Sequence, residues 1–368
     1  AGNVAYFENS NDQVVLVSPP GNANSFTYSA FGTVAIATPG VVRPLLTIAE
    51  ARFDGDGNRQ PDRVGDTVRV VGIVNSVNIQ TTNFGYFIQD ANAGIQIFRS
   101  GLVGAPSLRP GYRVMVTGRI EYFSGTTEIV PPDLATDITI LDTGNVVTSI
   151  PLTIGQYKAD PERYESRRIT LDVLHPFNFT SAQWPAAGSS ANLRAWNGID
   201  TLTLRIDSDT EIDGSPYPNF PVRITGVATQ FGSVPDTGYQ ITPIYIADFV
   251  PVNAPPVRNF RLLSPPNNAT IFVDTTATYT IRWRKAVDFN PSDSSLIYQW
   301  KPVPLAGQPS DNSGRDTVKT LTGAYLYGLI GTADSLRVRW TVLAKDTPNP
   351  PVSSLDTFAV TLRKAPPS

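Results

Sequence analysis

One sequence module occurs twice in this chain. Residues 112–123 recur as residues 220–231, and the Ile-Val-Pro that begins at Ile129 is echoed by an Ile-Thr-Pro that begins at Ile241. Self-similarity of this kind predicts two copies of one structural unit. The matched residues are Val114, Val116, Thr117, Gly118 and Phe123 in the first copy and Val222, Ile224, Thr225, Gly226 and Phe231 in the second.

Residue alternation predicts an all-β fold. Apolar and polar residues alternate with a period of two along most of the chain, and Gly, Pro, Asn and Asp separate these stretches. The 28 glycines and 32 prolines suit a fold with many turns. Helical periodicity is confined to residues 45–53 and 154–163, so we expect two short helices, one before each copy of the repeated unit.

The first copy is expected to form a five-stranded Greek-key barrel, because its Gly-containing first strand is followed by four more strands. The second copy places strands at corresponding positions. In the first module, residues 41–148, the strands expected are 66–77, 85–89, 95–98, 112–123 and 127–130. In the second module, residues 149–251, the corresponding strands are 169–174, 193–196, 202–206, 222–230 and 239–246.

The rest of the chain flanks these two modules. Residues 1–40 read as short β-strands in an N-terminal extension that is too small to bury a core of its own. We therefore expect the extension to pack on a neighbouring domain or on another molecule. Residues 252–256 predict a linker. Residues 257–368 predict a C-terminal β-sandwich of immunoglobulin or fibronectin type III type, with a core built on Trp283, Trp300 and Trp340.

Composition narrows the chemistry and the compartment. The absence of cysteine excludes disulfides, thiol catalysis and zinc-thiolate sites. A net charge of −3 gives no basic footprint, which disfavours nucleic-acid binding. No apolar run approaches the roughly 20 residues of a membrane helix. Because the chain begins at Ala1, we expect a signal peptide to have been removed, which places the protein outside a bacterial cell or on its surface.

Residues 66–130 resemble the OB-fold modules of secreted bacterial proteins, such as the accessory modules of extracellular nucleases. The stretches that carry the resemblance are 66–74, 85–90, 94–98 and 111–118, and the Gly-Tyr-Phe-Ile-Gln-Asp at 85–90 is the most specific of them. The second module is a weaker match. The last domain is similar to fibronectin type III or immunoglobulin-like modules of surface proteins. The resemblance implies export, together with binding or assembly.

The stretch from residue 54 to residue 62 suggests a calcium loop. Asp54, Asp56, Asn58, Gln60 and Asp62 place oxygen atoms at alternating positions, as in short loops that wrap a calcium ion. The sixth and twelfth residues depart from the EF-hand pattern, so we expect a looser loop. Its ion would be structural, and calcium is the only cofactor expected. The alternative is an acidic, glycine-rich turn without an ion.

Aromatic and basic residues on the first module suggest a ligand face. OB-folds stack single-stranded bases on strand aromatics beside a basic groove, and Tyr86, Phe98, Arg99 and Tyr122 offer such a set. The alternative is that Tyr86 or its neighbour Phe87 faces the barrel core, since adjacent strand residues point to opposite sides. The acidic overall balance favours the second interpretation.

The remaining polar clusters predict no enzyme. Arg167 and Arg168 lie beside Arg163 and near Lys158, and Glu162 and Glu165 interleave with this basic cluster. We therefore expect ion pairs on a solvated face rather than a phosphate site. The lone His175 has no nucleophile or carboxylate pair beside it in the sequence, which makes a catalytic role unexpected.

Together these patterns predict an exported, non-catalytic structural or adhesive surface protein. Its specific form would be a homo-oligomer or a self-assembling extracellular filament, in which the extension adds a strand to a neighbour's sheet. The residues expected to make that contact are Val4, Tyr6, Val14, Leu16, Phe26, Tyr28 and Phe31. The alternative is an OB-fold binding module for single-stranded nucleic acid or glycan that serves a secreted enzyme.

Overall fold

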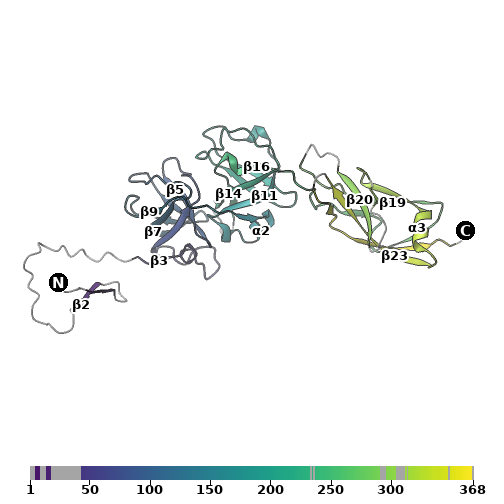
Figure 1. Ribbon diagram of the computed structural model, residues 1–368, viewed down its shortest axis with the longest axis horizontal. Coiled ribbons are helices and arrows are strands. Elements are labelled where there is room, and N and C mark those ends of the chain that lie inside the picture. The colour runs from purple at the N-terminus through teal and green to yellow at the C-terminus, as the bar shows by residue number, and fades with distance from the viewer. Residues whose placement is uncertain are drawn as a thin grey trace, which may run out of the picture.

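A computed structural model describes residues 5–8, 14–17, 43–232, 234, 237–290, 296–303, 311–312, 314–346 and 349–366. Strands dominate, as the alternation predicted, and the α-helices are short. Figure 1 shows the barrels and the sandwich following one another along the long axis of the molecule. The β1 (Ala5–Glu8) and β2 (Val14–Val17) strands pair as an antiparallel hairpin that precedes the first barrel.

The first barrel closes through five strands. These strands hydrogen-bond in the order β4-β5-β6-β8-β7, and β7 returns to pair with β4. The β6–β8 pair is parallel and the other four pairs are antiparallel. Two further strands, β3 and β9, extend the sheet. The strands are β3 (Leu45–Leu46), β4 (Thr67–Val74), β5 (Phe84–Gln89), β6 (Gly94–Arg99), β7 (Arg113–Phe123), β8 (Thr126–Val130) and β9 (Ile138–Asp142).

The second barrel repeats this topology. Its strands close in the order β11-β12-β13-β15-β14, β14 pairs again with β11, and β10 and β16 extend the sheet. The strands are β10 (Ile150–Leu152), β11 (Arg168–Pro176), β12 (Ala191–Trp196), β13 (Thr201–Ile206), β14 (Val222–Gln230), β15 (Tyr239–Thr242) and β16 (Phe249–Pro251). Three single 3-10 turns lie between them: η1 (Glu162–Tyr164), η2 (Ser181–Gln183) and η3 (Ile246–Asp248).

The repeated Thr-Gly dipeptide has the same structural role in both barrels. A Cβ atom on Gly118 would lie 2.7 Å from Ile129 and 2.9 Å from the Val130 backbone. A Cβ atom on Gly226 would lie 2.8 Å from Ile241 and 2.8 Å from the carbonyl oxygen of the next residue. Only glycine lets the long strand of each barrel approach the following strand this closely. The residues repeated in the sequence therefore make the same packing contact in both barrels.

A short capped helix lies against each barrel core. The α1 helix (Ile48–Ala51) begins at a capping box of Thr47 and Glu50, and α2 (Ile154–Ala159) begins at a second capping box, made by Thr153 and Gln156. Each helix places its first isoleucine, fully or almost fully buried, in the core of its own barrel. Both helices lie within the ranges that the sequence predicted.

The C-terminal module is a sandwich of two sheets around the three predicted tryptophans. One sheet has the order β17-β19-β22 and the other β18-β25-β23-β20-β21, with β24 paired to β23. Trp283, Trp300 and Trp340 are all at most 4% exposed. The α3 helix (Gly323–Ile330) joins the sheets and was not predicted. The strands are β17 (Leu262–Ser264), β18 (Ala269–Val273), β19 (Thr278–Trp283), β20 (Ile297–Val303), β21 (Asp311–Asn312), β22 (Val318–Thr322), β23 (Ser335–Lys345), β24 (Val352–Ser353) and β25 (Phe358–Lys364).

Candidate functional site

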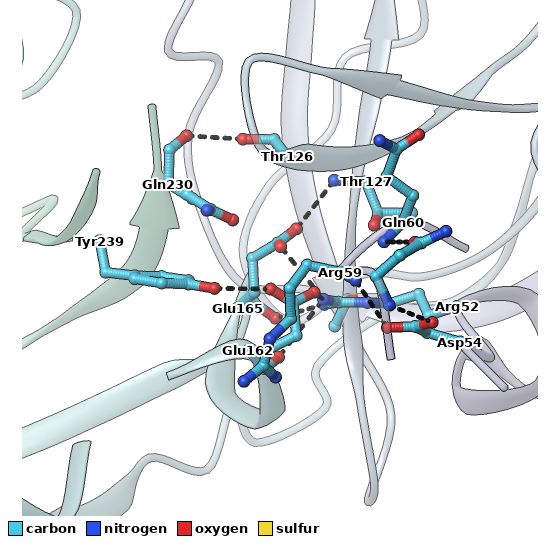
Figure 2. Close-up of polar contacts among 12 residues, drawn as sticks. Arg52, Asp54, Arg59, Gln60, Thr126, Thr127, Glu162, Glu165, Gln230 and Tyr239 are labelled. Atoms are coloured by element: carbon cyan, nitrogen blue, oxygen red, sulfur yellow. Dashed lines mark hydrogen bonds and ion pairs between the residues drawn. The ribbon is translucent and has the colours of Figure 1, made fainter. Parts of the chain in front are cut away.

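The two barrels are joined through a buried guanidinium. Arg52, at the end of α1, has a side chain only 8% exposed and reaches from the first barrel to the second. Its Nη2 lies 2.6 Å from Glu162 Oε1 and 3.1 Å from Glu165 Oε2. Figure 2 shows both carboxylates converging on this arginine. Buried charges are stable in a fold only when they are paired and hydrogen-bonded, so this cluster fixes one barrel against the other.

The fully buried Glu165 carboxylate bonds to the first barrel with both oxygens. Besides the Arg52 contact, its Oε1 accepts the backbone N–H of Thr127 at 3.0 Å. The Tyr239 hydroxyl donates to Glu162 at 2.9 Å and holds the second carboxylate in place. Burial raises the pKa of Glu165, Arg52 acts against that rise and Glu162 adds to it. Glu165 therefore takes up a proton at higher pH than a surface carboxylate does, chiefly because it is buried.

A second buried network lies beside the first. Asn75 Nδ2 donates to Gln89 Oε1 at 2.7 Å and to the Ser166 carbonyl at 2.8 Å. The backbone N–H of Arg168 also donates to Gln89 Oε1, and the Arg168 side chain pairs with Asp248. The prediction of ion pairs on a solvated face is wrong here, because Glu165, Arg167 and Arg168 are buried. Arg168 is 9% exposed because the first barrel covers the start of β11, and its Nη1 donates to the Asn75 carbonyl across the junction.

One glycine sets how closely the barrels approach. A Cβ atom on Gly94, the first residue of β6, would lie 2.5 Å from the carbonyl carbon and oxygen of Ser166. No side chain fits in that space. The Arg52 guanidinium also donates to the Gly94 carbonyl, at 2.7 Å. The glycine is thus needed for contact between modules rather than for a turn within one module.

The most specific stretch of the OB-fold resemblance is divided between core and junction. Tyr86 and Ile88 face the core of the first barrel. Phe87, between them, is 2% exposed and packs outward on Val227 and Ile244 of the second barrel. The alternation of the β5 strand therefore supplies one face to the barrel interior and the other to the neighbouring module.

A cleft of about 760 Å³ opens where the barrels diverge. The first barrel contributes Phe98, Tyr122 and Phe123, and the second contributes Phe231. Phe123 and Phe231 are equivalent residues of the repeat, and they are 63% and 67% exposed. The loops beside them touch, since the N–H of Gly232 donates to the Ser124 carbonyl at 2.7 Å. Both barrels thus offer an aromatic ring to the same cleft.

The structure brings together three of the four residues predicted as a ligand face. Phe98, Arg99 and Tyr122 all line the cleft. Tyr86 does not, because it is 8% exposed and its ring packs 4.8 Å from that of Phe84 in the barrel core. The alternative interpretation of Tyr86 as a core residue is therefore the one that the structure supports.

The cleft carries charges of both signs. Arg99 and Arg205 lie in its lining together with Glu121, Glu128 and Asp207. Burial, helped by Glu121 on the adjacent strand, raises the pKa of Glu128 to about 7. Aromatic rings, carboxylates and amides in one cleft suit a neutral polar ligand such as a sugar better than a polyanion. The amide side chains of the lining are Gln80, Gln96, Asn192, Gln230 and Gln240.

Three of the predicted calcium ligands lie close together. Carboxylate oxygens of Asp54, Asp56 and Asp62 are all within 4.8 Å of one another. Burial alone would raise the pKa of Asp54, but hydrogen bonds from Arg59, Gly57 and Asn58 lower it, so its carboxylate is held in the charged form. A set of oxygen donors of this kind is chemically suited to calcium.

Of the other two predicted calcium ligands, Asn58 and Gln60, the first has its side chain bonded within the loop. The Asn58 side chain donates to Asp56 and its oxygen accepts the Gln60 N–H at 2.7 Å. The Asn58 amide oxygen is therefore already engaged within the loop. The loop remains a calcium candidate on the strength of the carboxylates.

The predicted assembly residues fall mainly outside the described part of the chain. Tyr6 lies in β1, and Val14 and Leu16 lie in β2, where the backbone forms the hairpin. The registers Tyr6↔Leu16 and Glu8↔Val14 define the pairing. The others, which are Val4, Phe26, Tyr28 and Phe31, lie outside the described residues.

His175 has a packing role at the junction between the second barrel and the sandwich. Its ring stacks on Phe289 at 4.4 Å, with an angle of 11° between the ring planes. Trp196 meets the same phenylalanine edge to face at 5.3 Å. Burial lowers the pKa of His175, which keeps the imidazole neutral in this aromatic contact. The second junction is thus aromatic where the first is ionic.

The sequence predicted neither the junction between the barrels nor the junction between the second barrel and the sandwich. Arg52 lies in an otherwise ordinary helix end, and its acidic partners are 110 and 113 residues away. The one available signal was the density of acidic and basic residues at 162–168, which a solvated face explains equally well. Only the fold shows that another module covers that face.

No protein-family model matches the chain, and no curated protein matches it. Within the described residues, no helix is both long enough and apolar enough to cross a membrane.

Several solved structures match parts of the chain at low similarity. The fibronectin(III)-like modules of Clostridium thermocellum CbhA match with 10% identity and a TM-score of 0.19, over 52% of this chain and 94% of theirs. The extracellular domain of a protein assigned as a one component system in B. thetaiotaomicron matches with 10% identity and a TM-score of 0.22, over 80% of this chain and 37% of its own. Similarity this low leaves function to be argued from the residues themselves.

Proposed function

We propose that this protein is an exported, non-catalytic structural component of a bacterial surface, and that copies of it join head to tail into an extracellular filament. The observation that carries the proposal is the construction of the first junction. Arg52, Glu162 and Glu165 use their charges to lock two barrels together rather than to face a substrate. A chain whose modules are held firmly against one another suits a load-bearing or spacing role.

The order of the modules supports the same proposal. The β1–β2 hairpin precedes the first barrel, the sandwich follows the second, and the modules succeed one another along the long axis (Figure 1). A segment that adds as a strand to the far module of the next copy makes a heterologous contact. Such a contact does not close on itself and builds open polymers.

Removal of the extension tests this proposal. We expect the full chain to assemble and a chain that starts at Val41 to remain a monomer of the same barrels and sandwich. Light scattering measures the mass of each, and circular dichroism checks that the shortened chain is folded. A shortened chain that assembles as the full chain does would overturn the role of residues 1–40.

The cleft supports a second candidate function, the binding of a glycan. Phe98, Tyr122, Phe123 and Phe231 offer ring faces to a sugar, and the mixed charges disfavour a polyanion such as single-stranded DNA. A surface filament that also binds glycan would be adhesive. Titration with oligosaccharides and with single-stranded DNA separates the two ligands. Binding of DNA alone would contradict the preference for glycan.

A further inference from the structure

The sandwich contains an apolar groove of about 220 Å³ at the end that carries α3. Trp300 and Trp340 line it from one sheet, and Leu329 of α3 lines it from the side. Protein interiors rarely keep voids larger than a water molecule, and an apolar cavity of roughly 150 Å³ is enough to take a benzene ring. The groove is thus large enough to take an aromatic side chain from outside the module.

Two of the tryptophans that line the groove have buried indole donors without an acceptor among the described residues. The indole N–H groups of Trp300 and Trp340 have no hydrogen-bond partner among the described residues, although the side chains are only 4% and 2% exposed. Trp283 has the same lack but does not line the groove. An unpaired buried donor costs roughly 1–3 kcal/mol. A backbone carbonyl entering the groove would satisfy such a donor.

Strand edges flank the groove. In the part of the sandwich that is described, β19 pairs with β17 only at Arg282 and Trp283, so its stretch from Thr278 to Ile281 is bonded on one side, to β22. The β18 strand pairs with β25 alone. Tyr279 of β19 and Ile271 of β18 both line the groove. Unpaired edges beside an apolar groove are suited to the addition of a further strand.

We propose that this groove accepts residues 26–36 of a second copy of the chain. This insertion would be the contact that joins successive copies in the filament, and it rests on the proposed function. Residues 13–42 contain no charged side chain, in a chain where 17% of residues are charged. Within that stretch, Phe26, Tyr28, Val34 and Ile36 fall at alternating positions, with only Ala30 and Gly32 between them. As a strand, the segment presents one continuous apolar face.

The donor has to be another copy because the segment does not reach its own groove. Residue 26 is 17 residues from Arg43, and a fully extended chain of that length spans roughly 60 Å. Two barrels of about 100 residues, each roughly 30 Å across, lie between Arg43 and the sandwich, and the groove lies at the α3 end beyond them (Figure 1). Each chain therefore inserts its segment into the groove of another chain, and repeated insertion lengthens the polymer.

Two complementary full-length variants test the joint. In the donor variant, Val34→Asp and Ile36→Asp place charges on the apolar face. In the acceptor variant, Leu329→Trp fills the groove. We expect each variant alone to remain a monomer of about 40 kDa, because one lacks a donor and the other lacks an acceptor. Mixed together, they should form a pair of twice that mass that grows no further.

Matched controls make the outcome specific. Ser29→Asp places a charge on the opposite face of the segment. Leu336→Trp enlarges a half-buried residue that packs on the same core outside the groove. Both controls should assemble as the natural chain does. Normal assembly of Leu329→Trp would overturn the groove as acceptor and leave the proposed function intact. A natural chain that stays monomeric would overturn both.

Disulfide trapping reports the contact even if a bulky variant folds poorly. The chain has no cysteine, so a disulfide forms only between introduced thiols. Phe26→Cys chains mixed with Leu329→Cys chains should yield a covalent pair under mild oxidation. Phe26→Cys mixed with Leu336→Cys should yield much less. Equal yields from the two mixtures would contradict insertion at the groove.

Discussion

Arg52 of the first barrel places its Nη2 atom 2.6 Å from Glu162 Oε1 of the second, in a contact that solvent scarcely reaches. This contact differs in kind from the exposed ion pairs elsewhere on the molecule. The Arg52 guanidinium also pairs with Glu165, and the other oxygen of that carboxylate accepts a hydrogen bond from the first barrel. The two barrels therefore form one stabilised body, and the first three predictions concern that body.

Loss of the junction arginine should destabilise both barrels. Arg52→Ala removes the cationic partner of the buried Glu165 and of the partly exposed Glu162, and we expect a loss of about 3–5 kcal/mol in the free energy of unfolding. Arg63→Ala, which breaks an exposed pair with Asp66, should cost less than about 1 kcal/mol. Urea denaturation of both variants measures the difference. Equal stabilities would show that the junction does not couple the barrels.

The contact glycine gives a steric test of the same junction. Gly94→Ala puts a methyl group where the Ser166 backbone lies 2.5 Å away, so we expect a loss of about 1–3 kcal/mol. Gly328→Ala, in α3 with open space around the added atom, should be neutral or stabilising. Differential scanning calorimetry of both variants would reveal whether the barrels separate into two transitions. A Gly94→Ala protein that melts like the natural one would contradict the close approach.

Burial of Glu128 predicts that the contribution of this residue to stability grows on acidification. Its folded pKa of about 7 exceeds the ordinary value of 4.5, so the folded state binds more protons between these pH values than the unfolded state does. Its contribution to stability therefore increases as the pH falls from 7 to 4.5 and is lowest above pH 7.

Replacement of that carboxylate isolates its effect. At pH 8 we expect Glu128→Gln to be more stable than the natural protein, by an amount on the order of 1–3 kcal/mol, with the difference vanishing near pH 4.5. Glu211→Gln, at an exposed position, should follow the natural protein at every pH. Thermal melts at both pH values measure the difference in stability between each variant and the natural protein. A Glu128→Gln protein that gains nothing at pH 8 would contradict the raised pKa.

Calcium should stabilise the first barrel if the carboxylate loop binds it. We expect calcium at one hundred times its Kd to add about 2.7 kcal/mol to the free energy of unfolding, and a chelator to remove that gain. Asp56→Asn should abolish the response, and Asp133→Asn, outside the loop, should keep it. If neither calcium nor chelator changes the melting temperature, the loop is an ordinary acidic turn that binds no ion.

The sequence predicted the elements of this fold better than their contacts. Alternation located the five strands of each barrel to within a few residues, because one face of each strand is buried in its own module. It also placed Trp283, Trp300 and Trp340 in a core. It missed α3, whose eight residues carry no charged side chain and so lack a polar helix face.

The site was harder to predict because it lies between modules. Phe98, Arg99 and Tyr122 were identified because they are aromatic or basic residues near a strand end. The other wall of the cleft, with Phe231 and Arg205, comes from the second barrel, and no local pattern connects the two walls. Phe87 shows the same limit, since its apolar side chain covers a neighbouring module rather than its own core.

The measurement that most directly tests this account is the mass and shape of the intact natural chain, by light scattering with negative-stain electron microscopy. We predict long, regular fibres whose repeat corresponds to one chain. A uniform monomer of about 40 kDa at every concentration would contradict the account and would turn attention to the cleft as the functional site.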